Sequence, residues 1–581
     1  METLTQDLRF AFRILVKNPT FALAVVIVLA FSIGVNTTIF SVVSAVLIRP
    51  LPYKNSDRIM MIWETDLKRG LNRGIVSPAN YVDWKDQNQS FEYLSPWRFW
   101  YFNLTGVDEP ERVQGLLVAA NFFDMLGVKA ERGRTFLPEE EQPGNDRVVV
   151  VSHNLWQGRF GADPGVIGRT VTIEGEEYRV IGVLPAAFRF MKVLNRDLDI
   201  WVPLTIDRSQ VSRLDHSINV FGRLKQGVSL AQARSDLNGI MSRIERQYPE
   251  TNTGRGARVV PLRENYGERI RDTLLILLAA VGFVLLIACA NVANLLLARA
   301  TVRQREMAIR GALGAGRARL IRQMLTESVL LALVGGLFGG ILAYGGVNLL
   351  NNLIPNSVVA RVDSFSVDGR VLVYTSLISI VTGLLFGVAP GLQLSRKDIV
   401  EALKSGTRGS TSLRGRRLRS LLVGLEIALA VMLLIGAGLM IRSSLQLQNF
   451  DRGFQTKNIL TGQVWLSKAR YPQNAQLTQF YRTSLERLHS IPGVESASIV
   501  SFLPLSGLSD GVSFTVEGRP PPPQNDKPSA RYYVIGPQYF QTMGMTLVKG
   551  RELTGQDAEN VSGAVVIHET LAQRYWPDED A

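Results

Sequence analysis

Five long runs of apolar residues constrain the fold of this chain more than any other feature. Four runs contain no charged residue, and the fifth contains one, Glu426. Each run exceeds the roughly 20 residues that a helix needs to cross the hydrocarbon core of a bilayer. We therefore predict a membrane α-helical protein with five transmembrane helices. The five runs are residues 18–48, 273–298, 328–360, 371–395 and 420–441.

The first run resembles a signal peptide because Arg9, Arg13 and Lys17 precede it. It is much longer than the apolar region of about 7–15 residues in such a signal, and no A-x-A cleavage site closes it. We predict a retained anchor. The residues before it have an apolar face at helical spacing, which is typical of an amphipathic helix on the inner membrane surface.

Positive charge is concentrated in three segments between or before these runs. Residues 299–322 hold seven arginines and one glutamate, residues 396–419 hold eight basic and two acidic residues, and residues 1–18 hold three basic and two acidic residues. Together they account for the whole net charge of +13. Because cytoplasmic loops carry the excess of Lys and Arg, all three segments are predicted to be cytoplasmic. No basic patch is then left for nucleic acid.

This charge pattern divides the chain into alternating segments with the N-terminus inside and the C-terminus outside. The predicted segments are a cytoplasmic amphipathic helix at 1–18, a span at 19–45, an outer domain at 46–270, a span at 272–298, a cytoplasmic loop at 299–323, spans at 326–350 and 371–394, a cytoplasmic loop at 395–419, a span at 420–442 and a second outer domain at 443–581.

Residues that carry enzyme chemistry are sparse. Cys289 is the only cysteine and lies in a predicted span, so no disulfide can form within the chain. The four histidines show no metal-ligand spacing, and no phosphate-binding G-x-x-x-x-G-K-[ST] loop occurs. We therefore predict no catalytic residue, no metal site, no bound cofactor and no nucleotide hydrolysis by this chain.

The outer segments have the pattern of α+β domains. Residues 146–156, 170–185 and 199–204 are predicted strands, and residues 227–249 a helix. That helix begins with a capping box of Ser229 and Gln232. Its apolar stripe predicts core packing: Leu230, Ala233, Leu237, Ile240, Met241 and Ile244.

The chain also repeats itself. The sequence of residues 121–136, NFFDMLGVKAERGRTF, is similar to that of residues 538–553, QYFQTMGMTLVKGREL. We predict that the two outer domains are copies, each following one span, and that a helix at 472–490 corresponds to one near 77–90.

Three stretches of the chain resemble a known family. Residues 291–328, NVANLLLARATVRQREMAIRGALGAGRARLIRQMLTES, closely resemble FtsX/MacB-type permeases of ABC transporters, and so do residues 31–53. Residues 421–460 resemble the junction between the halves of duplicated acidobacterial permeases. That resemblance implies two MacB-like core domains and two sets of four spans. With four plus one spans, the chain is expected to be C-terminally incomplete.

The resemblance also implies that the loop after the second span holds a coupling helix for a separate ABC ATPase, which would bind the ATP and Mg²⁺. Apolar residues between the arginines indicate contact with a protein partner or a lipid surface, beyond what topology requires. We expect the loop from Arg303 to Arg319 to contain a short helix that lies across the cytoplasmic membrane face. The matching docking positions are Arg305, Glu306, Met307, Ala308, Arg310, Ala312, Leu313 and Gly314.

Small and polar residues in the spans predict helix packing. The third span holds two overlapping G-x-x-x-G patterns, and the fourth span holds another: Gly335, Gly336, Gly339 and Gly340, and Gly383, Gly387 and Gly391. Gly335, Gly339, Gly383 and Gly387 are selected as the packing residues. Asn291 and Asn294 predict interhelical hydrogen bonds, with a role in transport as the alternative. Glu426 is expected to pair with an arginine or to reach the interface, although an intramembrane carboxylate also suggests function.

The predicted function is that of a permease subunit in the bacterial inner membrane, driving efflux or extraction of a substrate. The alternative is a non-transporting subunit that transmits force or signals to an envelope partner, and a third hypothesis is an outer-facing receptor without an ATPase. The expected partners are the ATPase and the membrane, with a second permease copy or a periplasmic protein as further candidates.

Overall fold

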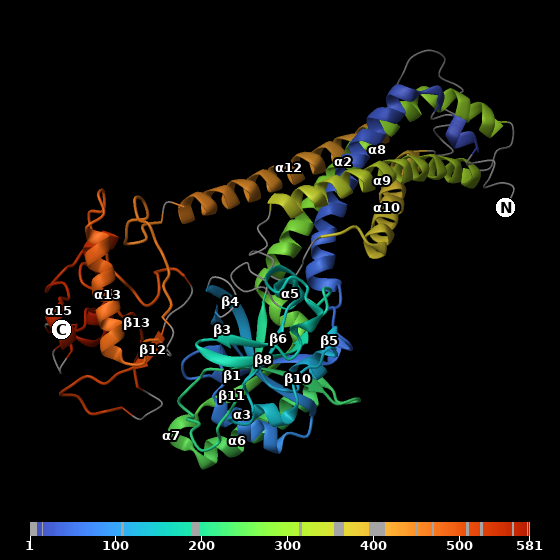
Figure 1. Ribbon diagram of the computed structural model, residues 1–581. Coiled ribbons are helices and arrows are strands. Elements are labelled where there is room, and N and C mark those ends of the chain that lie inside the picture. The colour runs from blue at the N-terminus through green and yellow to red at the C-terminus, as the bar shows by residue number, and fades with distance from the viewer. Residues whose placement is uncertain are drawn as a thin grey trace. The chain divides into compact units, whose positions relative to one another are not determined.

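The computed structural model describes residues 9–13, 16–105, 110–188, 190, 198–312, 317–353, 365–393, 413–448, 450–466, 470–506, 510–522, 527–559, 563–577 and 579. The chain forms two compact units (Figure 1). The membrane unit contains Met1–Asp57 and Pro261–Leu445, together with Arg189–Asp197. The outer unit contains Arg58–Phe188, Leu198–Val260 and Gln446–Ala581.

Five helices in the described part of the chain are long and apolar enough to cross a membrane, which confirms the predicted number of spans. Several extend beyond their apolar runs, because helical hydrogen bonding continues where the side chains become polar. Near the N-terminus, residues 9–13 and 16–17 are helical. The five helices are α2 (Pro19–Val43, continued by the π-helical turn Ser44–Ile48), α8 (Leu262–Ala312), α9 (Arg317–Leu353), α10 (Gly369–Gln393) and α12 (Leu413–Gln448).

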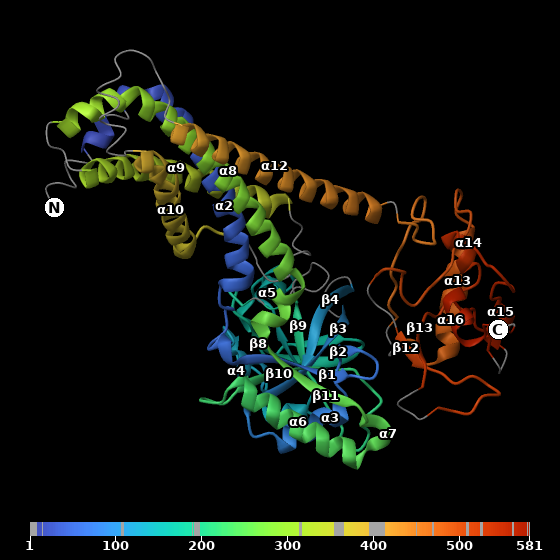
Figure 2. The ribbon, with the colours of Figure 1, turned by 180° about the vertical axis from the view of Figure 1, so that it is seen from behind.

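Four of these helices share one apolar core. Figures 1 and 2 show α2, α8 and α9 running together, with α10 against them. By contrast, the most apolar part of α12 is almost entirely exposed, and Leu429 is its one buried hydrophobic residue among those described. The buried core residues are Val25, Leu29, Ile33, Leu285, Cys289, Val292, Ala293, Leu331, Ala332 and Phe386.

The first outer domain is a mixed sheet of 11 strands in the order β11-β1-β10-β3-β4-β9-β6-β8-β5, with β2 paired to β1 and β7 paired to β3 and β8. Most pairs are antiparallel, but β4–β9 and β6–β8 are parallel. The strands are β1 (Ile59–Asp66), β2 (Leu71–Gly74), β3 (Phe91–Thr105), β4 (Glu111–Val118), β5 (Arg132–Gly133), β6 (Val148–Val151), β7 (Thr170–Ile173), β8 (Glu176–Val183), β9 (Ile200–Pro203), β10 (Asn219–Leu224) and β11 (Arg255–Pro261).

Helices cover this sheet over two separate cores. One core lies between α3 (Pro78–Gln87), α6 (Leu230–Gln247) and the strands around β1 and β10. The other surrounds α5 (His153–Arg159) and the strands from β6 to β9. The Ser229–Gln232 capping box and the buried stripe of α6 are confirmed.

The strand predicted at 146–156 is only partly right. Val148–Val151 form β6, but the chain then turns into α5, where the hydroxyl of Ser152 caps the first turn by accepting a hydrogen bond from the N–H of Leu155. The short apolar run of four valines predicted a buried strand, but its periodicity did not show that the strand ends at Val151 and a helix follows.

The second outer segment contains shorter elements. A helix occurs within 472–490, as predicted, and α3 occupies the position expected near 77–90. β12 and β13 form an antiparallel pair. The elements are α13 (Asn474–His489), β12 (Asp510–Ser513), β13 (Ser529–Tyr532), α14 (Tyr539–Met543), α15 (Gly555–Glu559) and α16 (Glu569–Tyr575). The short helix α14 resembles α4 (Phe122–Leu126) of the first domain in length.

Candidate functional site in the membrane unit

The predicted docking segment lies at the end of α8. Six of its eight residues, from Arg305 to Ala312, form the last turns of this helix, and Leu313 and Gly314 lie outside the described residues. The helix runs without a break from the span to Ala312, so residues 303–312 are not a separate short helix as expected. A strong helix-forming sequence allows the span to continue into the loop without a cap.

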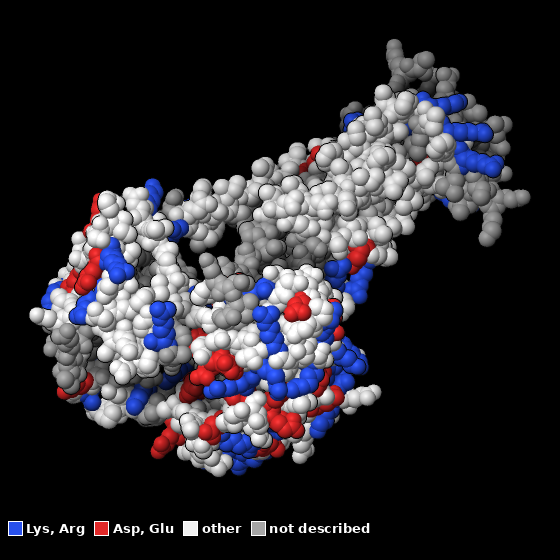
Figure 3. Space-filling model, viewed as in Figure 1, with Lys and Arg blue, Asp and Glu red and all other residues white. Residues whose placement is uncertain are grey.

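Basic side chains gather at this end of the membrane unit. Figure 3 shows them beyond a shaft that is nearly free of charge, at the end where α8 finishes and α9 begins in Figure 1. One described contact is made by Arg299, whose guanidinium lies 4.5 Å from the ring centre of Phe21 in α2. Such cation–π contacts suit an arginine at the boundary between apolar and polar surroundings.

The four glycines selected as packing residues lie at close helix contacts, and so does Gly336, whereas a Cβ on Gly340 would have nothing within 4 Å. A Cβ on Gly335 would stand 2.7 Å from the Cβ of Leu29, and one on Gly339 would stand 3.1 Å from the carbonyl oxygen of Ala30. These two glycines therefore face α2. On α10, a Cβ on Gly383 would stand 2.8 Å from the Cα of Val329, and one on Gly387 would stand 2.9 Å from the Cβ of Ser328.

The two selected asparagines have different surroundings. The side-chain amide of Asn291 donates a hydrogen bond of 2.8 Å to the carboxylate of Glu426, which joins α8 to α12. The expected arginine partner of Glu426 is thus replaced by an amide from a neighbouring span. The buried Oδ1 of Asn294 accepts no hydrogen bond among the described residues.

A third group of residues lies at the end of α2 that leads to the outer unit, and it was missed in the sequence. Arg49 follows the π-helical turn and donates from Nη2 to Ser366 at 2.9 Å and to Asp368 at 3.2 Å. Arg370 donates in turn to the carbonyl oxygen of Ile48 at 3.3 Å. These contacts bridge more than 300 residues of sequence, so no local pattern could have revealed them.

Asp368 is also the cap of α10. Its Oδ1 accepts hydrogen bonds of 3.1 Å from the backbone N–H groups of Arg370 and Val371, while its Oδ2 faces Arg49. Burial alone would raise the pKa of Asp368, but the N–H of Val371 and the charge of Arg49 outweigh it and hold this pKa below its usual value. The carboxylate is therefore ionised at neutral pH.

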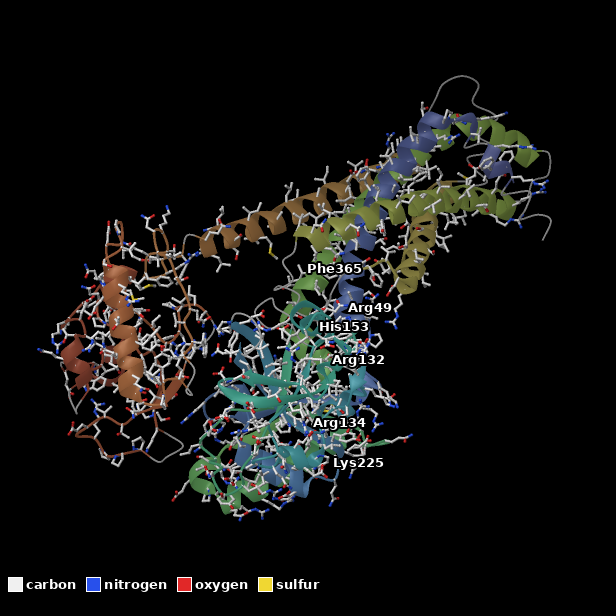
Figure 4. The ribbon with its side chains drawn as sticks, viewed as in Figure 1. Arg49, Arg132, Arg134, His153, Lys225 and Phe365 are labelled. Carbon is white, nitrogen blue, oxygen red and sulfur yellow. The ribbon has the colours of Figure 1, made fainter. Side chains whose placement is uncertain are left out.

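Phe365 fixes the same segment from the apolar side. Its side chain is buried among Val42, Val43 and Leu274. Its backbone N–H and C=O both bond to the side-chain amide of Asn351 at the end of α9, at 2.8 and 3.0 Å. Figure 4 shows Arg49 and Phe365 near the same end of α2. We call Arg49, Phe365, Ser366, Asp368 and Arg370 the outer clasp.

The outer clasp and the glycine contacts connect helices of the membrane unit to one another. Among the described residues, no cluster of three or more His, Cys, Asp or Glu side chains could hold a metal ion. The geometry defines a multi-pass helical membrane protein whose spans are tied together at close glycine contacts and continue into an outer α/β domain.

Comparisons with known proteins agree with this class. Residues 22–240 match the MacB-like periplasmic core domain, and residues 278–399 match the FtsX-like permease C-terminal domain. The chain belongs to the FtsX/MacB-like family of ABC transporter permeases. It is accordingly a multi-pass protein of the plasma membrane.

Two curated relatives show the extent of the similarity. The chain is 30% identical over 296 residues to the macrolide export ATP-binding/permease protein MacB of Burkholderia thailandensis, covering 49% of this chain and 42% of that protein. It is 29% identical over 291 residues to the uncharacterized ABC transporter permease YknZ of Bacillus subtilis, covering 49% and 68%. The match thus spans less than half of the Burkholderia protein.

A solved structure also matches. It is the periplasmic region of MacB from Actinobacillus actinomycetemcomitans, with 14% identity, a TM-score of 0.27, and coverage of 37% of this chain and 94% of that one.

Proposed function

We propose that this chain is a permease subunit that couples ATP hydrolysis in a separate ABC ATPase to motion of its outer domains. ATP and Mg²⁺ would bind to that ATPase and not to this chain. The observation that carries the proposal is the continuity of α8, which begins at Leu262, directly after the last strand of the first outer domain, and ends at Ala312 in the basic segment. A single helix can transmit a displacement at one end to the other, because its hydrogen bonds make it stiff along its axis.

The work performed on the outer side is the efflux or extraction of a hydrophobic or peptidic substrate. The spans hold almost no charged side chains, so a polar pathway for a hydrophilic solute has no support in the sequence. The same observation favours a second candidate, a non-transporting subunit that regulates an envelope partner. Uptake of candidate peptides and amphiphiles into inverted vesicles containing the chain and its ATPase would distinguish the two, since only the first predicts ATP-dependent accumulation.

Docking of the ATPase is tested at Leu313. Leu313→Asp should abolish capture of the cognate ATPase and its permease-stimulated ATP turnover, because an unpaired charge buried at an interface costs several kcal/mol, about 3–5. Arg317→Ala is the matched control and should change binding much less, as expected of a charge at the rim. If Leu313→Asp inserts into the membrane and still binds the ATPase like wild type, the segment is only a topological anchor and the proposed function loses its basis.

A further inference from the structure

The outer clasp lies where the first span ends and the chain continues towards the first strand of the outer unit. Arg49 lies between the last turn of the first span and the strand β1 of the outer unit, which begins at Ile59. On its other side, Ser366 and Asp368 lie directly before α10, and Asn351 at the end of α9 holds Phe365. The clasp therefore joins the connection between α9 and α10 to the point where α2 leaves the membrane unit.

Contacts further along α2 continue this connection. The rings of Phe40 and Tyr374 are stacked with their centres 3.7 Å apart, and the Tyr374 hydroxyl donates to Oδ1 of Asn36 at 2.6 Å. The hydroxyls of Thr37 and Thr375 lie 3.1 Å apart. The first turns of α10 are thus in register with the last turns of α2, so a shift of one helix would have to move the other.

The last turn of α2, directly before Arg49, is not a regular α-helix. Residues Ser44–Ile48 form a π-helical turn, and the buried hydroxyl of Ser44 has no hydrogen-bond partner among the described residues. Single π turns within helices often occur at functional sites. Here the turn places Arg49 in an extended conformation, facing Ser366 and Asp368.

The exposure of the ion pair indicates what it does. The side chains of Arg49 and Asp368 are 40% and 28% exposed, and ion pairs this open to solvent contribute little to stability. The buried side chain of Phe365 holds the segment before α10 in place. The ion pair instead fixes the angle at which α10 and α2 meet. A role in stability alone would be served by the apolar contacts.

We propose that Arg49 and Asp368 are positioning residues that make the outer ends of α2 and α10 move as one body, so that a displacement of the spans reaches the outer unit through α2. This proposal rests on the proposed function, in which an ATPase displaces the spans. Its central claim, the rigid link between two helix ends, is measurable without the ATPase.

The test measures the distance between spin labels at Ile48→Cys and Leu372→Cys in the full chain, in nanodiscs and with Cys289→Ser as background. Both positions are exposed, and Cys289 is buried. We expect one narrow distribution of the distance between the two labels. It should be the same in the nucleotide-free complex with the ATPase and in the complex that is trapped with ATP and vanadate. Arg49→Ala and Asp368→Asn should broaden it. Asn can still cap α10, so Asp368→Asn separates the ion pair from the cap.

A second readout separates positioning from structure. Arg49→Ala and Asp368→Asn should keep the thermal midpoint and ATPase binding of wild type but lose stimulation of ATP turnover. Arg49→Lys, which retains the charge, should restore part of it. Arg442→Ala removes an exposed arginine of α12 and is the control that should change neither readout.

The outcomes test the clasp and the proposed function separately. The proposal is overturned if both clasp variants keep a narrow distance distribution and stimulate ATP turnover fully. It is also overturned if stimulation is lost only to the extent that the thermal midpoint falls. If wild type binds no ATPase, the proposed function fails, while the label distances in the nucleotide-free chain still decide whether the clasp links the two helices.

Discussion

Arg551 holds the carboxylate of Asp557 with two parallel hydrogen bonds of 2.7 Å, as Arg134 holds Glu140 with bonds of 2.6 and 3.0 Å. The two pairs are separated by the same interval, 417 residues, which also separates the repeated sequence motifs. In each pair the carboxylate accepts a further backbone N–H, from Thr554 in one and from Leu137 in the other.

The local backbone repeats as well. α4 and α14 both end at a glycine with left-handed backbone, Gly127 at φ 70° and Gly544 at φ 61°. A glycine at this position closes a helix without the steric cost of a Cβ. The recurrence of this hydrogen-bond geometry at the same interval favours the inference that the two outer segments derive from one domain.

Replacing Glu140 should remove a pH dependence of stability. Burial alone would raise the pKa of Glu140, but hydrogen bonds from Arg134 and the N–H of Leu137 hold it below the usual value. A carboxylate with a lowered folded-state pKa stabilises the fold above its unfolded pKa of about 4.3, and this contribution is lost as pH falls. The thermal midpoint of wild type in detergent, followed by tryptophan fluorescence, should therefore fall more steeply below about pH 5 than that of Glu140→Gln.

The partner arginine offers the matching control. Arg134→Ala leaves the buried carboxylate without its guanidinium and should cost about 1 kcal/mol at neutral pH, with a smaller cost at acid pH. Equal slopes for wild type and Glu140→Gln would show that this pair has no part in the acid sensitivity.

Gly339→Leu should disrupt the four-helix bundle. A Cβ at this position would lie 3.1 Å from the carbonyl oxygen of Ala30 and 3.1 Å from the amide nitrogen of Gly34. Both are backbone atoms, which cannot move away by a change of rotamer. Overpacking of this kind costs about 1–3 kcal/mol. Unfolding in mixed micelles with increasing SDS should reveal the loss. Gly340→Leu adds the same side chain one residue away, where nothing lies within 4 Å, and should behave like wild type.

Loss of the Asn291–Glu426 bond should release α12 from α8. Interhelical hydrogen bonds in membranes average about 0.6 kcal/mol and reach about 1.7. A double-mutant cycle of Asn291→Leu and Glu426→Leu in SDS unfolding should give a coupling energy in this range, since little else in the described residues of α12 is buried. Additive effects of the two substitutions would mean that the contact does not hold the helix. Glu426→Gln keeps an acceptor and should lose less than Glu426→Leu.

The predicted orientation places the N-terminus and the basic loops in the cytoplasm. An alkaline phosphatase reporter fused after residue 410 should be inactive, whereas the same reporter after residue 450 should be active, because the enzyme requires an oxidising compartment. Activity at residue 410 would reverse the topology.

The sequence determined the spans and the division into membrane and outer parts. Long uncharged runs leave a chain few alternatives to crossing a bilayer, and Ser229 and Gln232 define the start of α6 from four residues of local sequence. The glycine spacing in α9 and α10 likewise indicated close helix contacts, because small residues repeat on one face of a helix.

Only the tertiary structure decided which helices those contacts join and which polar groups meet. Glu426 lies opposite Asn291 instead of an arginine, and Arg49 reaches Asp368 across 319 residues of sequence. Such pairings depend on the rotation and depth of each helix in the bundle. These are set by the packing of all the helices together, and no periodicity within a single helix records them.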